Sequence, residues 1–131
     1  MDKPAPLDTE LVNRFVVAGH ADLDAVREML ADRPSLVNAT WDWGGGDWET
    51  ALGGASHMGR SDIAGFLLAA GARMDIFCAT MLGLTDIVMA MIAADGRALT
   101  ALGPHGIGLV QHAEAGGGAG LAMRLRELGA S

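Results

Sequence analysis

The sequence predicts an all-α solenoid of about four helix–turn–helix units, and three observations support this prediction. Apolar residues recur at the three- and four-residue spacing of amphipathic helices. Small residues suited to tight turns recur along the chain, with similar residues at fixed distances after them. The chain has 131 residues, half of them apolar, which is the size of one domain with a continuous core. Because a single helix pair cannot bury its own apolar face, neighbouring pairs are expected to stack.

The clearest unit spans residues 49–76. It predicts a first helix over 51–58, a turn at Gly59 and a second helix over 62–70. Thr50 is expected to cap the first helix, because a threonine at this position accepts a hydrogen bond from the first turn.

The second helix of this unit has its own start and stop residues. Ser61 or Asp62 is expected to cap its first turn, and Gly71 is expected to end it in a left-handed conformation. Its apolar residues keep helical spacing and predict one buried face. They are Ile63, Phe66, Leu67 and Ala70.

The remaining units align with this one on their turn residues. The spacing between turns varies, so the helices are kept while the connectors change length. Pro34 is expected to end the second helix of the first unit. The aligned turns lie at Ala21, Gly59, Gly83 and Gly117. The chain is therefore predicted to be one domain, residues 1–131, with units over roughly 9–39, 40–74, 75–102 and 103–131.

The second unit, TALGGASHMGRSDIAGFLLAAGA, resembles the ankyrin-repeat pattern TPLHxAAxxGHxxvvxxLLxxGA over nearly its whole length. The last unit, GPHGIGLVQHAEAGGGAGLAMRLRELGA, keeps the turn glycines and the closing LGA. The chain thus resembles a small bacterial-type ankyrin-repeat protein with degenerate repeats and degenerate hairpin fingers. It departs from the pattern at Ala51, where the family has proline, and at Gly53, where it has histidine. The third unit leaves no room for a hairpin finger after Gly71.

The segment WDWGGGDWE, residues 41–49, is the most unusual part of the chain. It holds all three tryptophans and three consecutive glycines in a long connector, and long connectors are uncommon without a role. Tryptophan is enriched at binding hot spots, and glycine permits sharp turns. Either this segment binds a ligand or its tryptophans only pack on the adjacent helices. The candidate binding residues here are Trp41, Asp42, Trp43, Asp47 and Trp48.

The ankyrin resemblance also implies a concave groove, lined by the fingers and by one face of each first helix. Groove positions lie five, two and one residues before each turn, and His20 occupies one of them. The groove is then small, apolar and rich in methionine, which favours an apolar surface or a small organic ligand. The alternative is a set of exposed helix faces with no ligand. The candidate groove residues are His57, Met58, Cys78, Met81 and His112, with His105 in the turn that enters the last unit.

Histidines and carboxylates also allow acid–base chemistry. His57 and His105 with Asp42 and Glu49 would supply a proton-transfer pair, because imidazole titrates near neutral pH. The spacing matches no zinc motif, and a single cysteine cannot make a cysteine-rich site. No metal and no cofactor is therefore expected.

The composition excludes several classes of partner. With a net charge of −7, the chain is not expected to bind nucleic acid, and it has no basic helix for a membrane surface. One cysteine and the absence of a leader pattern favour the cytoplasm. The charge-free stretch between Asp86 and Asp95 has an apolar outer face, which points either to a homodimer or to internal packing.

Two functional hypotheses follow. The leading one is a binding module that recognises a protein partner or a small apolar organic ligand through the Trp-rich segment and the groove. The alternative is a small enzyme, an isomerase, cyclase or hydrolase, that acts on a small organic molecule in the same groove. Catalysis needs a histidine and a carboxylate directed at one cavity, whereas binding needs only the tryptophans and the apolar lining.

Overall fold

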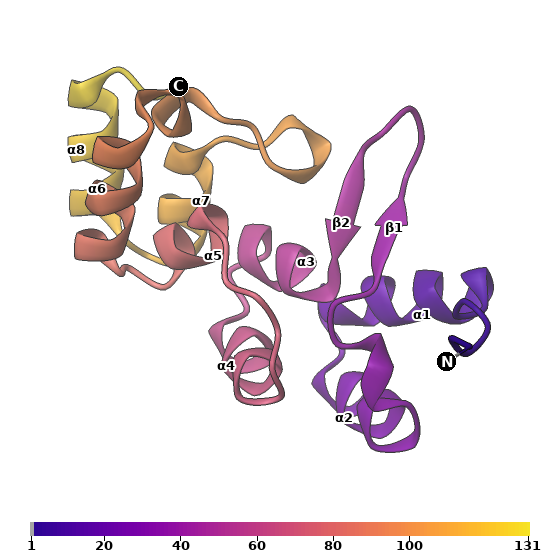
Figure 1. The fold of residues 1–131 in the computed structure, drawn as a ribbon. Helices are drawn as coiled ribbons and strands as arrows, with labels where there is room; N and C mark the ends of the chain where they lie inside the picture. Colours follow the sequence, from indigo (N-terminus) through magenta and orange to yellow (C-terminus); the bar gives the residue numbers. More distant parts are fainter. Residues whose placement is uncertain (1) are drawn as a thin grey trace.

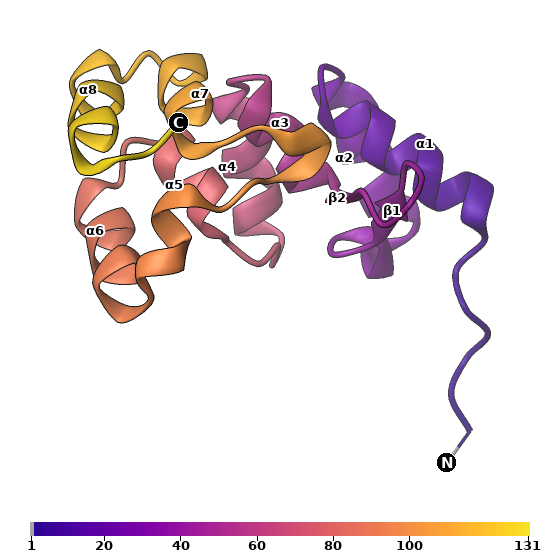
Figure 2. The same ribbon diagram turned by 90° about the horizontal axis from the view of Figure 1, so that it is seen from above.

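The computed structural model describes residues 2–131 and is mostly helical, with one small two-stranded sheet (Figures 1 and 2). Three short 3₁₀ turns lie in the connectors, at Pro34–Leu36, Gly96–Thr100 and Pro104–Gly106. The strands are β1 (Thr40–Asp42) and β2 (Trp48–Thr50). The helices are α1 (Thr9–Gly19), α2 (Leu23–Asp32), α3 (Ala51–His57), α4 (Ser61–Ala69), α5 (Ile76–Met81), α6 (Thr85–Ala94), α7 (Leu109–Ala115) and α8 (Ala119–Leu128).

The helices are arranged in four consecutive pairs. Within each pair the two helices pack together, as α1 with α2, α3 with α4, α5 with α6 and α7 with α8. The first helices of successive pairs also contact one another, α1 with α3, α3 with α5 and α5 with α7. The row of first helices runs through the middle of Figure 1, and the hairpin β1–β2 rises from one side of it.

The turns between paired helices use glycine where the sequence predicted it. Gly59, Gly83 and Gly117 have φ angles of 68°, 72° and 78°, a left-handed region that glycine enters without steric cost. Gly59 also allows a close approach, because a Cβ atom there would overlap the carbonyl oxygen of Ala115. This contact brings the α3–α4 turn against the end of α7.

The predicted cap of α3 is confirmed, whereas the predicted cap of α4 is wrong. Thr50 caps α3 as expected, accepting a hydrogen bond from the Gly53 amide at 3.0 Å. The expectation of a Ser61 or Asp62 cap is wrong, because α4 already begins at Ser61 and has no side-chain cap. Asp62 instead forms an ion pair with Arg60 at 2.9 Å.

The Trp-rich segment forms an antiparallel hairpin, β1–β2, in which Trp41 pairs with Glu49 and Asp42 with Trp48. The three glycines 44–46 all have positive φ and form its tip. The Asp42 carboxylate holds the tip by accepting hydrogen bonds from the Gly44 and Gly46 amides. No strand lies between residues 70 and 76, so the described chain has no hairpin in front of α5.

A second projection lies between α6 and α7. Residues 102–108 form a loop closed by a single antiparallel bridge between Leu102 and Gly108. In Figure 1 this loop, in orange, reaches toward the hairpin. We call these two elements the hairpin (residues 40–50) and the 102–108 loop.

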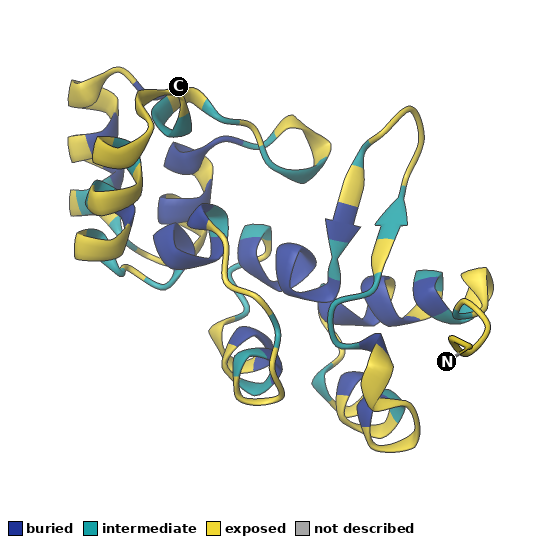
Figure 3. Cartoon of the chain, viewed as in Figure 1, coloured by how far each residue is buried: buried dark blue, intermediate teal, exposed yellow. Residues whose placement is uncertain are grey.

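The core follows the row of first helices, which Figure 3 shows as the most continuously buried part of the chain. One cluster of buried side chains is centred on α1 to α4, with Phe15, Ile63 and Leu67 fully buried. A second is centred on α5 to α8, with Val88 and Leu125 fully buried. Among residues 2–131 no helix has the length and apolar character needed to cross a membrane.

Candidate functional site

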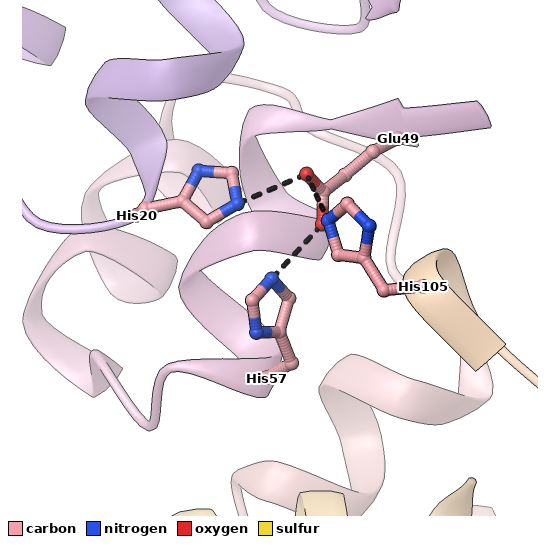
Figure 4. A group of neighbouring side chains, drawn as sticks. All are labelled: His20, Glu49, His57 and His105. Carbon is pink, nitrogen blue, oxygen red and sulfur yellow. Dashed lines mark ion pairs between the residues drawn. The ribbon is translucent and has the colours of Figure 1, made fainter. Parts of the chain in front are cut away.

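The most unusual feature of the structure is a buried carboxylate surrounded by three imidazole rings (Figure 4). The Glu49 side chain has no exposed surface. Its Oε1 lies 3.0 Å from His20 Nε2 and 3.4 Å from His105 Nε2, and its Oε2 lies 3.1 Å from His57 Nε2. We call these four residues the His–Glu cluster.

Four separate elements bring the cluster together. Glu49 is the middle residue of β2, so strand alternation directs it away from the face occupied by Trp48 and Thr50. His20 follows the last residue of α1, and His57 is the last residue of α3. α1 packs against α3 and both helices contact β2, which brings His20 and His57 within reach of Glu49. His105 reaches the cluster from the 102–108 loop.

His105 is locked in place by the hairpin. It has a φ of 61°, the only positive φ of any non-glycine residue among residues 2–131. The Asp47 carboxylate accepts a hydrogen bond from the His105 amide at 2.8 Å and lies 2.9 Å from His105 Nδ1. Asp47 therefore fixes both the backbone and the ring of His105, and directs its Nε2 toward Glu49.

Trp43 covers the cluster from the hairpin side. Its indole Nε1 donates a hydrogen bond to Glu49 Oε1 at 3.0 Å. Its ring lies near two of the imidazoles, with ring centres 6.2 Å from that of His20 and 5.6 Å from that of His105. Trp43 thus combines an apolar wall with one polar contact to the carboxylate.

The electrostatics of the cluster favour an ionised carboxylate. Burial alone would raise the pKa of Glu49, but contacts with His20, His57 and Trp43 outweigh it and lower the pKa to about 2. The hydrogen bond to Glu49 raises the pKa of His20, against the opposing effect of burial. A buried charge held by several polar groups is an arrangement concentrated at functional sites.

Two polar atoms of the cluster lack hydrogen bonds. Glu49 Oε2 and His57 Nε2 are both buried, and neither makes a hydrogen bond with any residue from 2 to 131, although they lie 3.1 Å apart. Buried polar atoms without partners are rare in folded proteins because each forfeits its hydration. The cluster therefore has unused coordination and hydrogen-bonding capacity.

A separate cleft of about 310 Å³ opens between the hairpin and the 102–108 loop. It lies on the Trp48 and Thr50 face of β2, opposite Glu49. Trp48 is 59% exposed. Two carboxylates, two aromatic rings and no cationic side chain line the cleft. Its residues are Thr40, Gly46, Asp47, Trp48, Thr50, Gly53, Asp75, Phe77, Leu102, Gly103 and Pro104.

The structure brings together three of the four residues proposed for acid–base chemistry, namely Glu49, His57 and His105. The fourth, Asp42, is not among them, because its carboxylate is bound to the hairpin tip. Trp41, the cross-strand partner of Glu49, packs against the first core cluster. The cleft beside Trp48 is lined by hairpin residues and by Leu102, Gly103 and Pro104, and His57 is not part of its lining.

Three residues that were predicted to line the groove are instead buried in the core. Cys78 and His112 have no exposed surface and Met81 has almost none, so they are core side chains. They are buried because α5 and α7 pack directly against each other and against α3. The His112 ring lies 5.0 Å from the Phe77 ring, and its Nδ1 lies 2.8 Å from the Gly108 carbonyl oxygen. Met58, by contrast, is exposed.

His20 is the residue that the predicted site set lacked. The alignment on turns gave it a groove-facing position one residue before Ala21, close to the position that His57 occupies before Gly59. This position relative to the turn was the sequence signal that could have identified His20. It placed two imidazoles on neighbouring helix ends, but it could not show that Glu49 points between them.

The chain matches no protein-family model, no curated protein and no solved structure at a level that would show a relationship.

Proposed function

We propose that this chain is a binding module of the ankyrin type, a single-domain solenoid of four units that holds a ligand between its two projections. Four consecutive helix pairs, three of them with a glycine turn, and a hairpin in front of the second pair support the ankyrin interpretation. The observation that carries the binding function is the cleft between the hairpin and the 102–108 loop, with the exposed Trp48 at its wall.

The lining of the cleft favours a ligand with a cationic group. Asp47 and Asp75 supply negative charge, and Trp48 and Phe77 supply aromatic faces that attract cations. No lysine or arginine lines the cleft, and the whole chain carries a net charge of −7. At about 310 Å³ the cleft suits a group the size of an amine side chain or a small organic molecule. The sequence favoured a small apolar ligand, and the two aspartates in the cleft lead us to propose an amphipathic cation in its place.

Ligand-observed NMR tests this proposal with pairs of small molecules that differ only in charge. A set of alkylammonium and quaternary ammonium compounds is compared with neutral isosteres, and a lysine-containing peptide with its acetylated form. We expect the cations to bind and the neutral members to bind more weakly. Free amines and basic peptides both carry a cationic group. Comparing the binding of the small ammonium compounds with that of the lysine-containing peptide shows which of the two the cleft prefers.

Two variants locate the binding to the cleft. Trp48→Ala should weaken binding, because it removes one aromatic wall. Asp75→Asn should weaken binding through charge alone, because asparagine caps a helix as well as aspartate does and α5 is kept. Met123→Ala, at an exposed position on α8, is the matched control. Equal binding of charged and neutral members, or wild-type binding by Trp48→Ala, would refute the proposal.

A second candidate function, a small acid–base enzyme, is favoured by one specific observation. Glu49, His57 and His105 converge, and acid–base catalysis requires a histidine and a carboxylate in such proximity. Mass spectrometry of a metabolite mixture incubated with the wild type and with Glu49→Gln tests it. A compound consumed only by the wild type supports the enzyme, and identical mixtures argue against it.

A further inference from the structure

We propose that His20, Glu49, His57 and His105 together bind one divalent first-row transition-metal ion. Each residue offers one ligand atom, and these four atoms lie within 4.8 Å of one another. The inference does not depend on the ligand proposed for the cleft, which lies on the other face of β2.

The spacing of the ligand atoms fits a shared cation. His20 Nε2 and His105 Nε2 lie 3.0 and 3.4 Å from Glu49 Oε1, and His57 Nε2 lies 3.1 Å from Oε2. Neighbouring ligands about 2.0–2.1 Å from a tetrahedral zinc ion stand roughly 3.3–3.4 Å apart, and octahedral neighbours stand closer. The four ligand atoms lie within 4.8 Å of one another, so side-chain rotations that draw them closer together would complete a coordination sphere.

The outer hydrogen bonds orient two of the three imidazoles for this role. His20 Nδ1 is 2.9 Å from the Val16 carbonyl oxygen, and His105 Nδ1 is 2.9 Å from the Asp47 carboxylate. Each contact places a ring proton on Nδ1, so Nε2, which faces Glu49, is the nitrogen that a metal ion would bind after displacing the proton shared with the carboxylate. Metal-binding histidines characteristically donate a hydrogen bond from the N–H of their second ring nitrogen to a carbonyl or carboxylate oxygen in this way.

One oxygen of the carboxylate makes no hydrogen bond among residues 2–131. Trp43 holds Glu49 Oε1, whereas Oε2 is buried with no hydrogen bond among the described residues. His57 Nε2 beside it is also buried and makes no hydrogen bond among the described residues. A cation between them would supply the missing interaction for both atoms, and its positive charge would balance the buried carboxylate.

The donor set indicates the class of metal. Three imidazoles and one carboxylate suit zinc, iron, cobalt, nickel or copper, whereas calcium and magnesium prefer oxygen ligands. His105 is 35% exposed, while Glu49 is fully buried. The ion would thus enter from the side of the 102–108 loop and keep a position on that side for water or a further ligand.

Metal binding is measured on the full chain, produced without a polyhistidine tag and stripped with a chelator. The protein is titrated with Zn²⁺ against a chromogenic chelator, and with Co²⁺ by visible absorption. We expect one ion per chain, cobalt bands typical of nitrogen and oxygen ligands, and a higher melting temperature with Zn²⁺. Mg²⁺ should have no such effect.

Variants then assign the ion to the cluster. His105→Asn and Glu49→Gln should each lower zinc affinity by about ten-fold or more, since even outer-shell changes cost about 10–100-fold. Asparagine tolerates the positive φ of His105, so this variant keeps the loop. Asp47→Asn, which loosens His105 without removing a ligand, should weaken binding less. His112→Gln, at the only histidine outside the cluster, should bind as the wild type does.

Two results would overturn the proposal. One is the absence of stoichiometric Zn²⁺ or Co²⁺ binding by the folded wild type. The other is wild-type affinity in both His105→Asn and Glu49→Gln. Either result would leave the cluster as a group that holds protons or braces the hairpin. The binding function proposed for the cleft would stand, because Trp48→Ala tests it separately.

Discussion

Replacing Gly59 with alanine should destabilise the protein for two separable reasons. The first is conformational, because Gly59 has a φ of 68° and a left-handed conformation costs an L-residue about 1–2 kcal/mol. The second is steric, because the new Cβ would overlap the carbonyl oxygen of Ala115 on α7. Overpacking of this kind costs about 1–3 kcal/mol. The expected total loss of unfolding free energy is about 2–5 kcal/mol.

Gly83→Ala is the matched control for this variant. Gly83 occupies the equivalent turn between α5 and α6 with a φ of 72°, and a Cβ atom there would meet nothing within 4 Å. It should therefore lose only the conformational part, about 1–2 kcal/mol. The difference between the two variants measures the close approach of Gly59 to Ala115.

Urea unfolding followed by circular dichroism checks this prediction. Both variants should keep the helical signal in the absence of urea and the same dependence on urea concentration, so that only the midpoint falls. If Gly59→Ala and Gly83→Ala lose equal stability, the close approach carries no energy and the reasoning is wrong.

Three further outcomes are expected. His112→Gln should change how stability depends on pH: burial lowers the pKa of His112 below 6.5 in the folded state. The unfolded chain therefore takes up the proton first as pH falls, and the stability of the wild type relative to this variant should decrease below pH 6.5. A difference that stays constant with pH would contradict this. Cys78 should react with a thiol reagent far more slowly in the native protein than in urea, because burial raises its pKa to about 11, and equal rates would contradict its burial. Asp22→Ala should cost about 1 kcal/mol in urea unfolding, because Asp22 caps α2 through the Ala25 amide, and an unchanged midpoint would show the cap to be unimportant.

Local signals in the sequence were enough to predict the helical elements. The left-handed turns at Gly59 and Gly83 and the Thr50 cap depend on neighbouring residues only, so the sequence shows them directly. The cap of α4 was mispredicted because Asp62 has a competing partner, Arg60, which a cap pattern does not consider.

The site was less predictable because its contacts join distant parts of the chain. Glu49 and His57 are close in sequence and both were candidates, but their meeting with His20 depends on how α1 packs on α3. The contact between His105 and Asp47 spans 58 positions and requires both projections to lean toward each other. Metal-binding motifs depend on short spacings within one element, so a set of ligands drawn from four elements has no such signature.

The same long-range contacts bear on how the molecule unfolds. In a linear array each helix pair touches only its neighbours, so terminal pairs can fray while the middle stays folded. Here the second pair is tied to the fourth twice, at the Asp47–His105 contact and where Gly59 meets Ala115. The third pair lies between these two units, so its opening would disturb the Asp47–His105 and Gly59–Ala115 contacts that join them. The part of the chain from the hairpin to α7 should consequently melt as one cooperative block, leaving α8 and the first pair as the places where opening begins.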